Sequence, residues 1–245
     1  MLRRAGPICF WGEGRGGVGA EANWIEARGK IIVICGIAKV CCLHAMKKLS
    51  LTFDDGPSPP CTEAILAVLS YHSVPATFFM IGERMLAHEA TVKRVEQAGH
   101  VIGNHTRTHR NLCGATFEDL DREINRWGQY FRPPGGHYDE GVLKYLRDHD
   151  IQLAMWDAEG LDWKLKTADE IVAYLDAQIS SLEGDSAIVL LHDGDSEDVG
   201  SEHIGGNRWA TVEATDRIIT RYRAQGFEFV PLREMTLPRG PKVWR

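Results

Sequence analysis

Two histidines four residues apart, His105 and His109, have a spacing that could support metal chemistry. On a helical turn, side chains at i and i+4 lie on one face, so both imidazoles could bind the same ion. Such a pair taken alone is more often two surface or capping histidines. Asp55 changes the balance, because the rigid Gly56-Pro57 turn after it can aim a carboxylate. Two imidazoles and one carboxylate leave coordination positions for water and substrate, which is the pattern of a catalytic metal site.

Asp54 and Asp55 are adjacent carboxylates, and such a pair can divide metal binding and proton transfer between its members. A simpler interpretation is a solvated acidic turn or a helix N-cap, which is common for Asp before Gly-Pro-Ser. A phosphoryl-transfer aspartate is a third interpretation. That chemistry usually shows Asp-x-Asp, and no acid pair for magnesium follows a later apolar run. The pair is therefore a poor match for phosphoryl transfer.

Three further polar clusters each follow a short apolar run, at residues 132–136, 159–163 and 190–193. Arg132 is a weak signal by itself, since a surface arginine before a turn would look the same. His192 is more informative, because a loop should begin beside it. Asp162 and Trp163 offer a carboxylate to orient an imidazole and an aromatic wall for a sugar ring. In a βα barrel the carboxyl ends of all strands open on one face, so these clusters are predicted to meet there.

The apolar pattern predicts strands and helices in alternation. Strands are expected at 46–53, 76–81, 100–103, 130–133, 151–156, 187–191 and 227–231, and helices at 62–72, 83–98, 117–127, 140–148, 168–181 and 212–225. Repeated β–α alternation indicates a parallel sheet covered by helices. We predict an α/β fold, a distorted (β/α) barrel with about seven parallel strands that is TIM-barrel-like.

The composition is that of an ordinary globular protein, with 44% apolar and 25% charged residues and a net charge of -6. After residue 45 there are 22 basic and 31 acidic side chains, a balance of -9. An acidic domain is a poor nucleic-acid binder, so no nucleic-acid partner is expected. The six cysteines match no zinc-ribbon spacing and predict free thiols, with a Cys61–Cys113 disulfide as the alternative.

Residues 1–45 differ from the rest, being Gly-rich up to residue 30 and then apolar with one interruption at Lys39. The apolar part is shorter than the roughly 20 residues of a membrane span and is a poor signal peptide. We expect a poorly structured, dispensable extension before a catalytic domain at 46–245; in the alternative, residues 31–45 pack on the barrel. If these residues are an upstream reading of the gene, Met46 is the working start. A chain that starts there has no export signal, so a cytoplasmic location is expected, with a secreted or cell-envelope location as the alternative.

The five clusters together resemble the polysaccharide deacetylase family, the NodB-homology domain of carbohydrate esterase family 4. The resemblance runs from about Lys47 to about Leu232 and is most specific at residues 52–57 and at the His-Thr-x-x-His block of 105–109. It implies a distorted (β/α) barrel with fewer than eight units. The implied reaction is metal-dependent removal of N-acetyl groups from an amino-sugar glycan.

The resemblance also implies which groups react. Asp54 would be the base and His192 the acid. Asp55, His105 and His109 would bind one divalent metal ion, zinc, with cobalt and nickel as alternatives. Such an ion polarises an amide carbonyl and acidifies water.

Supporting roles follow from the same resemblance. Arg132 would brace the base, and Asp162 would orient the acid. Trp163 and Leu190 would line the acetyl pocket, and the backbone N–H of Gly135 would be an oxyanion donor.

Two residues depart from the family pattern, which usually has Tyr in place of Gly135 and Asp in place of Glu159. These departures affect the expected substrate preference more than the reaction. Two rival functions stay open: a related metal hydrolase of small C–N compounds, and a catalytically silent carbohydrate- or metal-binding module. A silent relative would be expected to lose the base or a ligand, and all are present here. The sequence indicates neither the glycan nor the oligomeric state.

Overall fold

The computed structural model describes residues 23–27, 30–35, 39–43, 47–125, 127–182, 184–195, 207–235 and 237. The chain divides into two compact units, Met1–Met46 and Lys47–Arg245. The described part of the first unit is an antiparallel sheet of β1 (Asn23–Ala27), β2 (Lys30–Cys35) and β3 (Lys39–Leu43). The rest of the expected extension lies outside the described residues, and its dispensability stays a prediction.

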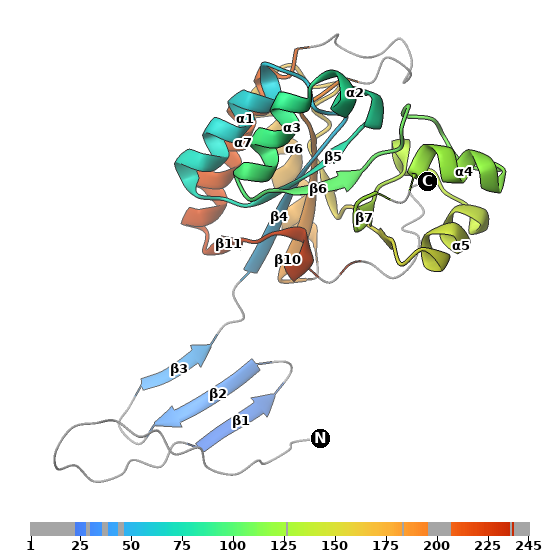
Figure 1. Ribbon diagram of the computed structural model, residues 1–245. Coiled ribbons are helices and arrows are strands. Elements are labelled where there is room, and N and C mark those ends of the chain that lie inside the picture. The colour runs from blue at the N-terminus through green and yellow to red at the C-terminus, as the bar shows by residue number, and fades with distance from the viewer. Residues whose placement is uncertain are drawn as a thin grey trace. The chain divides into compact units, whose positions relative to one another are not determined.

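The second unit is built on a curled parallel sheet (Figure 1). Its strands are β4 (Lys47–Asp54), β5 (Ala76–Met80), β6 (Val101–Asn104), β7 (Tyr130–Phe131), β8 (Gln152–Leu153), β9 (Ala158–Glu159), β10 (Ser186–His192) and β11 (Phe227–Phe229). Seven of them run in the order β8-β7-β6-β5-β4-β10-β9, and β11 pairs with the start of β4. The predicted distorted barrel of about seven parallel strands is confirmed. The strand expected at 151–156 is shorter, and β9 was not predicted.

Helices cover one face of this sheet, with α1, α3, α6 and α7 grouped together (Figure 1). The helices are α1 (Cys61–His72), α2 (Gly82–Ala87), α3 (Glu89–Gln97), α4 (Phe117–Ile124), α5 (Glu140–Asp148), α6 (Ala168–Ser181) and α7 (Trp209–Ala224), with short 3-10 turns at Pro134–Gly136 and Leu232–Glu234. The single helix expected at 83–98 is two helices, because His88 leaves the helical conformation (φ -132°, ψ 44°). Similarly, α4 ends early because Asn125 is left-handed.

The described helices include none that is both long and apolar enough to cross a membrane. Cys61 and Cys113 are free thiols, the first buried and the second exposed, so the alternative disulfide between them is not formed.

Strand alternation separates the core from the site. On β4, Leu51 and Phe53 point into the apolar core under the helices, whereas Thr52 and Asp54 belong to the opposite face. On β10 the same alternation puts His192 on the face of Asp54, and the parallel register pairs these two residues directly. Two polar side chains thus meet at the carboxyl ends of neighbouring central strands.

Candidate active site

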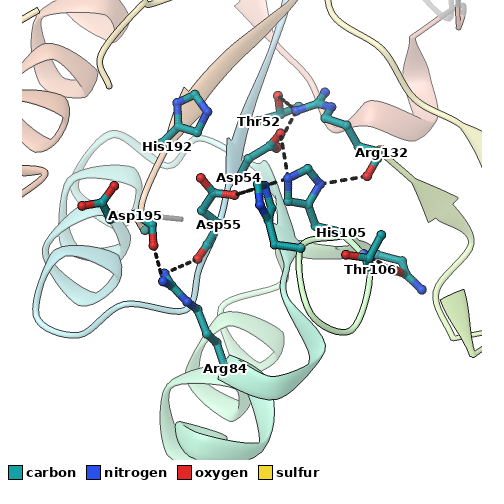
Figure 2. Close-up of polar contacts among 12 residues, drawn as sticks. Thr52, Asp54, Asp55, Arg84, His105, Thr106, Arg132, His192 and Asp195 are labelled. Carbon is teal, nitrogen blue, oxygen red and sulfur yellow. Dashed lines mark hydrogen bonds and ion pairs between the residues drawn. The ribbon is translucent and has the colours of Figure 1, made fainter. Parts of the chain in front are cut away.

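Asp55, His105 and His109 converge at the carboxyl end of the sheet. Figure 2 shows Asp55 and His105 of this group. Oδ1 of Asp55 lies 3.3 Å from Nε2 of His105 and 3.2 Å from Nε2 of His109, and all three residues are buried. Among the described residues, Oδ1 has no hydrogen-bond donor. Nδ1 of His105 lies 2.8 Å from the carbonyl of Arg132, which can only accept, so Nδ1 carries a proton and Nε2 is the ring nitrogen left to bind a metal ion. This set of donor atoms fits the divalent ion that the resemblance implies.

The chain between the two histidines is an irregular loop, so the predicted helical turn is wrong. Thr106 (φ 65°) and His109 (φ 63°) are left-handed, and the Asn104 side chain accepts a hydrogen bond from the Thr106 N–H at 2.8 Å. Asp55 is left-handed too (φ 72°). Each such residue costs of order 1–3 kcal/mol, a cost that persists where surrounding structure over-determines the conformation and that is common at functional sites.

The Asp55 carboxyl is held in its charged form. Burial by itself raises its pKa, but His105 and His109 beside it, with His192 nearby, hold that pKa well below the ordinary value. A carboxylate must be deprotonated to bind a metal ion, so this environment suits a ligand.

Asp54 is fixed by the guanidinium of Arg132, as the bracing role requires. Nη1 of Arg132 donates to Oδ1 of Asp54 at 2.7 Å and to Oγ1 of Thr52 at 2.8 Å, and Nε donates to the carbonyl of Ala154 at 2.9 Å. Arg132 is fully buried, and its guanidinium lies 4.1 Å from the centre of the Phe79 ring. The other carboxylate oxygen, Oδ2, lies toward the candidate metal ligands, 3.8 Å from Nε2 of His105.

His192 and Asp162 form a buried pair. Nδ1 of His192 lies 2.7 Å from Oδ1 of Asp162, and the His192 backbone N–H donates to Oδ2 at 2.8 Å. The Thr211 hydroxyl also donates to Oδ2, at 2.7 Å. Burial lowers the pKa of His192, but Asp162 outweighs burial and raises that pKa to about 9. His192 is therefore protonated at neutral pH and can act as a proton donor.

Asp54, His192 and the three candidate metal ligands face one cavity of about 190 Å³, whereas Arg132 and Asp162 do not line it. The predicted Gly135, Trp163 and Leu190 all line it. Sequence reasoning missed Trp156 as a wall residue and treated Glu159 only as a departure from the family pattern; both line the cavity. Trp156 could have been found, because it ends the strand predicted at 151–156 and the carboxyl ends of the strands open on the site face.

Residues that hold the site residues in place were also missed. Thr52 could have been found, because strand alternation puts it on the face of Asp54. Glu123, which accepts from the Thr108 backbone and hydroxyl at 3.0 Å, and Thr211 had no such signal, because their partners lie 15 and 49 residues away.

Comparison with known proteins gives the family of this chain. The family model "Polysaccharide deacetylase" matches residues 44–154. A peptidoglycan-N-acetylglucosamine deacetylase of Bacillus cereus is 34% identical over 201 residues, covering 77% of this chain and 88% of the relative. This chain belongs to the polysaccharide deacetylase family. A second relative is a chitooligosaccharide deacetylase of Rhizobium leguminosarum bv. trifolii. It is 35% identical over 194 residues, covering 74% of this chain and 88% of the relative.

Solved structures of the family share the fold. A peptidoglycan N-acetylglucosamine deacetylase superposes with a TM-score of 0.67 at 32% identity, covering 78% of this chain and 88% of that one. A family 4 acetyl xylan esterase from Clostridium thermocellum, in complex with cobalt, gives 0.64 at 28% identity, with 77% and 89% covered. A pseudoenzyme of the family from Bacillus anthracis gives 0.65 at 25% identity, with 78% and 65% covered. The fold alone therefore does not establish activity.

Proposed function

We propose that this member of the polysaccharide deacetylase family hydrolyses N-acetyl groups of an amino-sugar oligo- or polysaccharide. The observation that carries the proposal is the convergence of a metal donor set, a braced carboxylate and a protonated imidazole on one cavity. The names of the peptidoglycan and chitooligosaccharide deacetylases among its relatives support a glycan as the substrate class.

The proposed reaction hydrolyses the C–N bond of an amide. An amide carbonyl is a poor electrophile, and the amine is a poor leaving group. Asp55, His105 and His109 would hold the divalent ion, which when bound supplies polarisation of the amide carbonyl and acidification of water. Asp54 accepts the proton of the attacking water through Oδ2. The hydrogen bond from Arg132 to Oδ1 fixes the orientation of this carboxylate.

The tetrahedral oxyanion and the leaving group need their own partners. The N–H of Gly135, which lines the cavity, is the proposed oxyanion donor. His192 gives its proton to the nitrogen as the C–N bond breaks, and acetate and a free amine are released. Trp163 and Leu190 would enclose the acetyl methyl group.

The metal is proposed to be zinc, with cobalt or nickel as alternatives. Two imidazoles and a carboxylate suit all three ions, so the ligand set does not choose between them. Elemental analysis of the protein purified without added metal is the direct measurement.

Acetate release from a panel of substrates tests the function. The panel contains chitin oligomers, peptidoglycan fragments and small acetylated amines, each with and without a chelator. Chelator-sensitive release from the glycans supports the proposal. Release from the small amides alone would favour the C–N hydrolase, and no release from any substrate, with metal bound, would favour the silent module.

Cellular location follows from the substrate in this proposal. The peptidoglycan-directed relatives favour a secreted or cell-envelope enzyme, whereas a soluble oligosaccharide substrate fits the cytoplasm. The cytoplasmic location stays a prediction, and fractionation of the source cells would decide it.

A further inference from the structure

Arg208, which directly precedes α7, is a buried cation with no part in the reaction described above. Its side chain is only 2% exposed. Nε donates to the carbonyl of Gly194 at 2.7 Å, Nη1 to the carbonyl of Asp162 at 3.1 Å, and Nη2 to Oδ1 of Asp195 at 3.0 Å. A buried charge is tolerated when it is paired and hydrogen-bonded, and here all three nitrogens have partners.

The partners of Arg208 belong to the segments that carry the reaction. Asp162 holds His192 by two hydrogen bonds, through Nδ1 and through the backbone N–H. Gly194 follows two residues after His192 and packs on the metal-ligand turn, where a Cβ would lie 2.1 Å from the carbonyl oxygen of Asp55. One guanidinium therefore joins the segment that orients the acid to the turn that follows it.

A second arginine extends this link toward the metal ligands (Figure 2). Nη1 of Arg84, on α2, donates to the carbonyl of Asp55 at 2.8 Å, and its Nη2 donates to the carbonyl of Asp195. Asp195 thus lies between Arg84 and Arg208. The chain of contacts runs from the ligand Asp55, through Arg84 and Asp195, to Arg208 and the acid pair.

We propose that Arg208 is a positioning residue for deacetylation, which holds Asp162 and the Gly194 turn together and so fixes His192 opposite Asp54. This inference rests on the proposed function and deepens it, because it assigns a role to a residue outside the cavity. It implies that losing Arg208 harms proton donation more than substrate or metal binding.

The test compares the Arg208→Gln and Arg208→Lys variants with the parent and with Arg217→Gln, an exposed arginine on the same helix α7. For Arg208→Gln we expect kcat to fall about 10–100-fold, with KM and metal content unchanged. The alkaline limb of the pH–rate profile should move to lower pH, because Asp162 no longer stays against the imidazole. Arg208→Lys should recover part of kcat, since it keeps the charge but not the planar set of donors. Arg217→Gln should match the parent.

A second readout is independent of turnover. In the parent, the Nδ1–H proton of His192 on Asp162 should give a low-field proton NMR signal, which His192→Ala removes and identifies. That signal should be lost or shifted in Arg208→Gln. A folded Arg208→Gln protein with the parent's alkaline limb and NMR signal would overturn the proposal, even if kcat were lower, because its role would then be structural.

The proposal stays testable if the Arg208→Gln variant does not fold or if the parent has no activity. If Arg208→Gln does not fold, Arg208→Lys and Asp195→Ala decide, since Asp195 is partly exposed and its truncation removes one of the three hydrogen-bond partners of Arg208; parent-like kinetics and NMR signals in both would overturn the proposal. If the parent releases no acetate, the proposed function fails, and the NMR comparison still decides the role of Arg208.

Discussion

Asp54 and Asp55 are adjacent in the sequence but have different environments. Asp54 is bound to the Arg132 guanidinium at 2.7 Å, whereas Oδ1 of Asp55 faces two imidazole nitrogens. The difference arises because Asp54 is the last residue of β4 and Asp55 turns into a left-handed conformation, so the two side chains diverge. We therefore expect the two carboxylates to fail in different ways when they are changed.

Substitution with asparagine should separate the base from the ligand. Asp54→Asn should keep the metal ion and lose about 10²–10⁴-fold in kcat, because an amide cannot accept the water proton. Asp55→Asn should lose metal and activity together, since an amide oxygen is a weaker, neutral ligand. Metal content and kcat are measured on the same preparations. Full metal occupancy in Asp55→Asn with activity retained would refute the ligand assignment.

Removing a ligand imidazole tests the other side of the metal site. His105→Ala and His109→Ala should each lower metal affinity by at least roughly tenfold, and excess metal should restore part of the activity. The matched control is His149→Ala, a partly buried histidine beside Tyr145 and outside the cavity. Unchanged metal content in His105→Ala would mean that the ion binds elsewhere.

The pH dependence of activity at alkaline pH is expected to follow the protonation of His192, which Asp162 controls. Asp162 raises the His192 pKa to about 9, and the acid works only when protonated, so activity should fall as pH rises through that value. Asp162→Asn removes the negative partner, which lowers the pKa and moves the alkaline limb to lower pH. Asp176→Asn, which affects a carboxylate paired with Arg221, serves as the control. An unmoved limb in Asp162→Asn would show that another group sets it.

At the scale of elements, the site depends on how closely the turns after β4 and β10 approach. The backbone N–H of Asp193 donates to the carbonyl of Asp54 at 3.1 Å, and Gly194 packs against the carbonyl of Asp55. The parallel register that pairs His192 with Asp54 brings these two turns together. A side chain at position 194 would separate them.

Gly194→Ala is expected to damage the site through the backbone. Its Cβ would lie 2.1 Å from the Asp55 carbonyl oxygen, and this backbone atom cannot rotate away as a side chain could. Overpacking of this kind costs typically about 1–3 kcal/mol of stability and should also lower metal affinity by moving Asp55. Gly184→Ala is the control, since its Cβ would have no neighbour closer than 3.8 Å. Thermal melts and metal titrations of both variants are compared; equal behaviour would contradict the close approach.

At the scale of the whole molecule, the two units differ in what they contribute to the described site. The unit Lys47–Arg245 contains the sheet, its helical cover and every site residue. The unit Met1–Met46 includes the antiparallel strands β1 to β3 and contributes no residue to the described site. The catalytic unit is therefore expected to fold and work without the first one.

Expression of residues 46–245 tests this division. We expect the melting temperature and kcat/KM of the shorter protein to match those of the full chain, because the described core and cavity residues all belong to the second unit. A large loss of either would mean that residues 1–45 stabilise the barrel, as in the alternative where residues 31–45 pack on it. The prediction of a cytoplasmic location would then lose its main support.

Short-range patterns in the sequence by itself determined most of the barrel. Helices α5 and α6 have the predicted bounds, because Asp139 caps the first and the Thr167–Glu170 capping box begins the second. The core strand β4 followed from the alternation of Leu49, Leu51 and Phe53, and β5 and β10 followed from short apolar runs that indicate burial on both faces. Such signals depend on neighbouring residues and can be found without knowing the fold.

The resemblance on five short motifs pointed to the family and the ten candidate site residues, but contacts between distant segments decided their geometry. The left-handed loop at 105–109 and the edge strands β8 and β9 depend on those contacts. Arg208 shows the limit most clearly: its partner Asp162 lies 46 residues away, and its burial follows from packing. An arginine before a helix has the same local pattern whether it is solvated or buried, so only the tertiary structure could place it behind the acid pair.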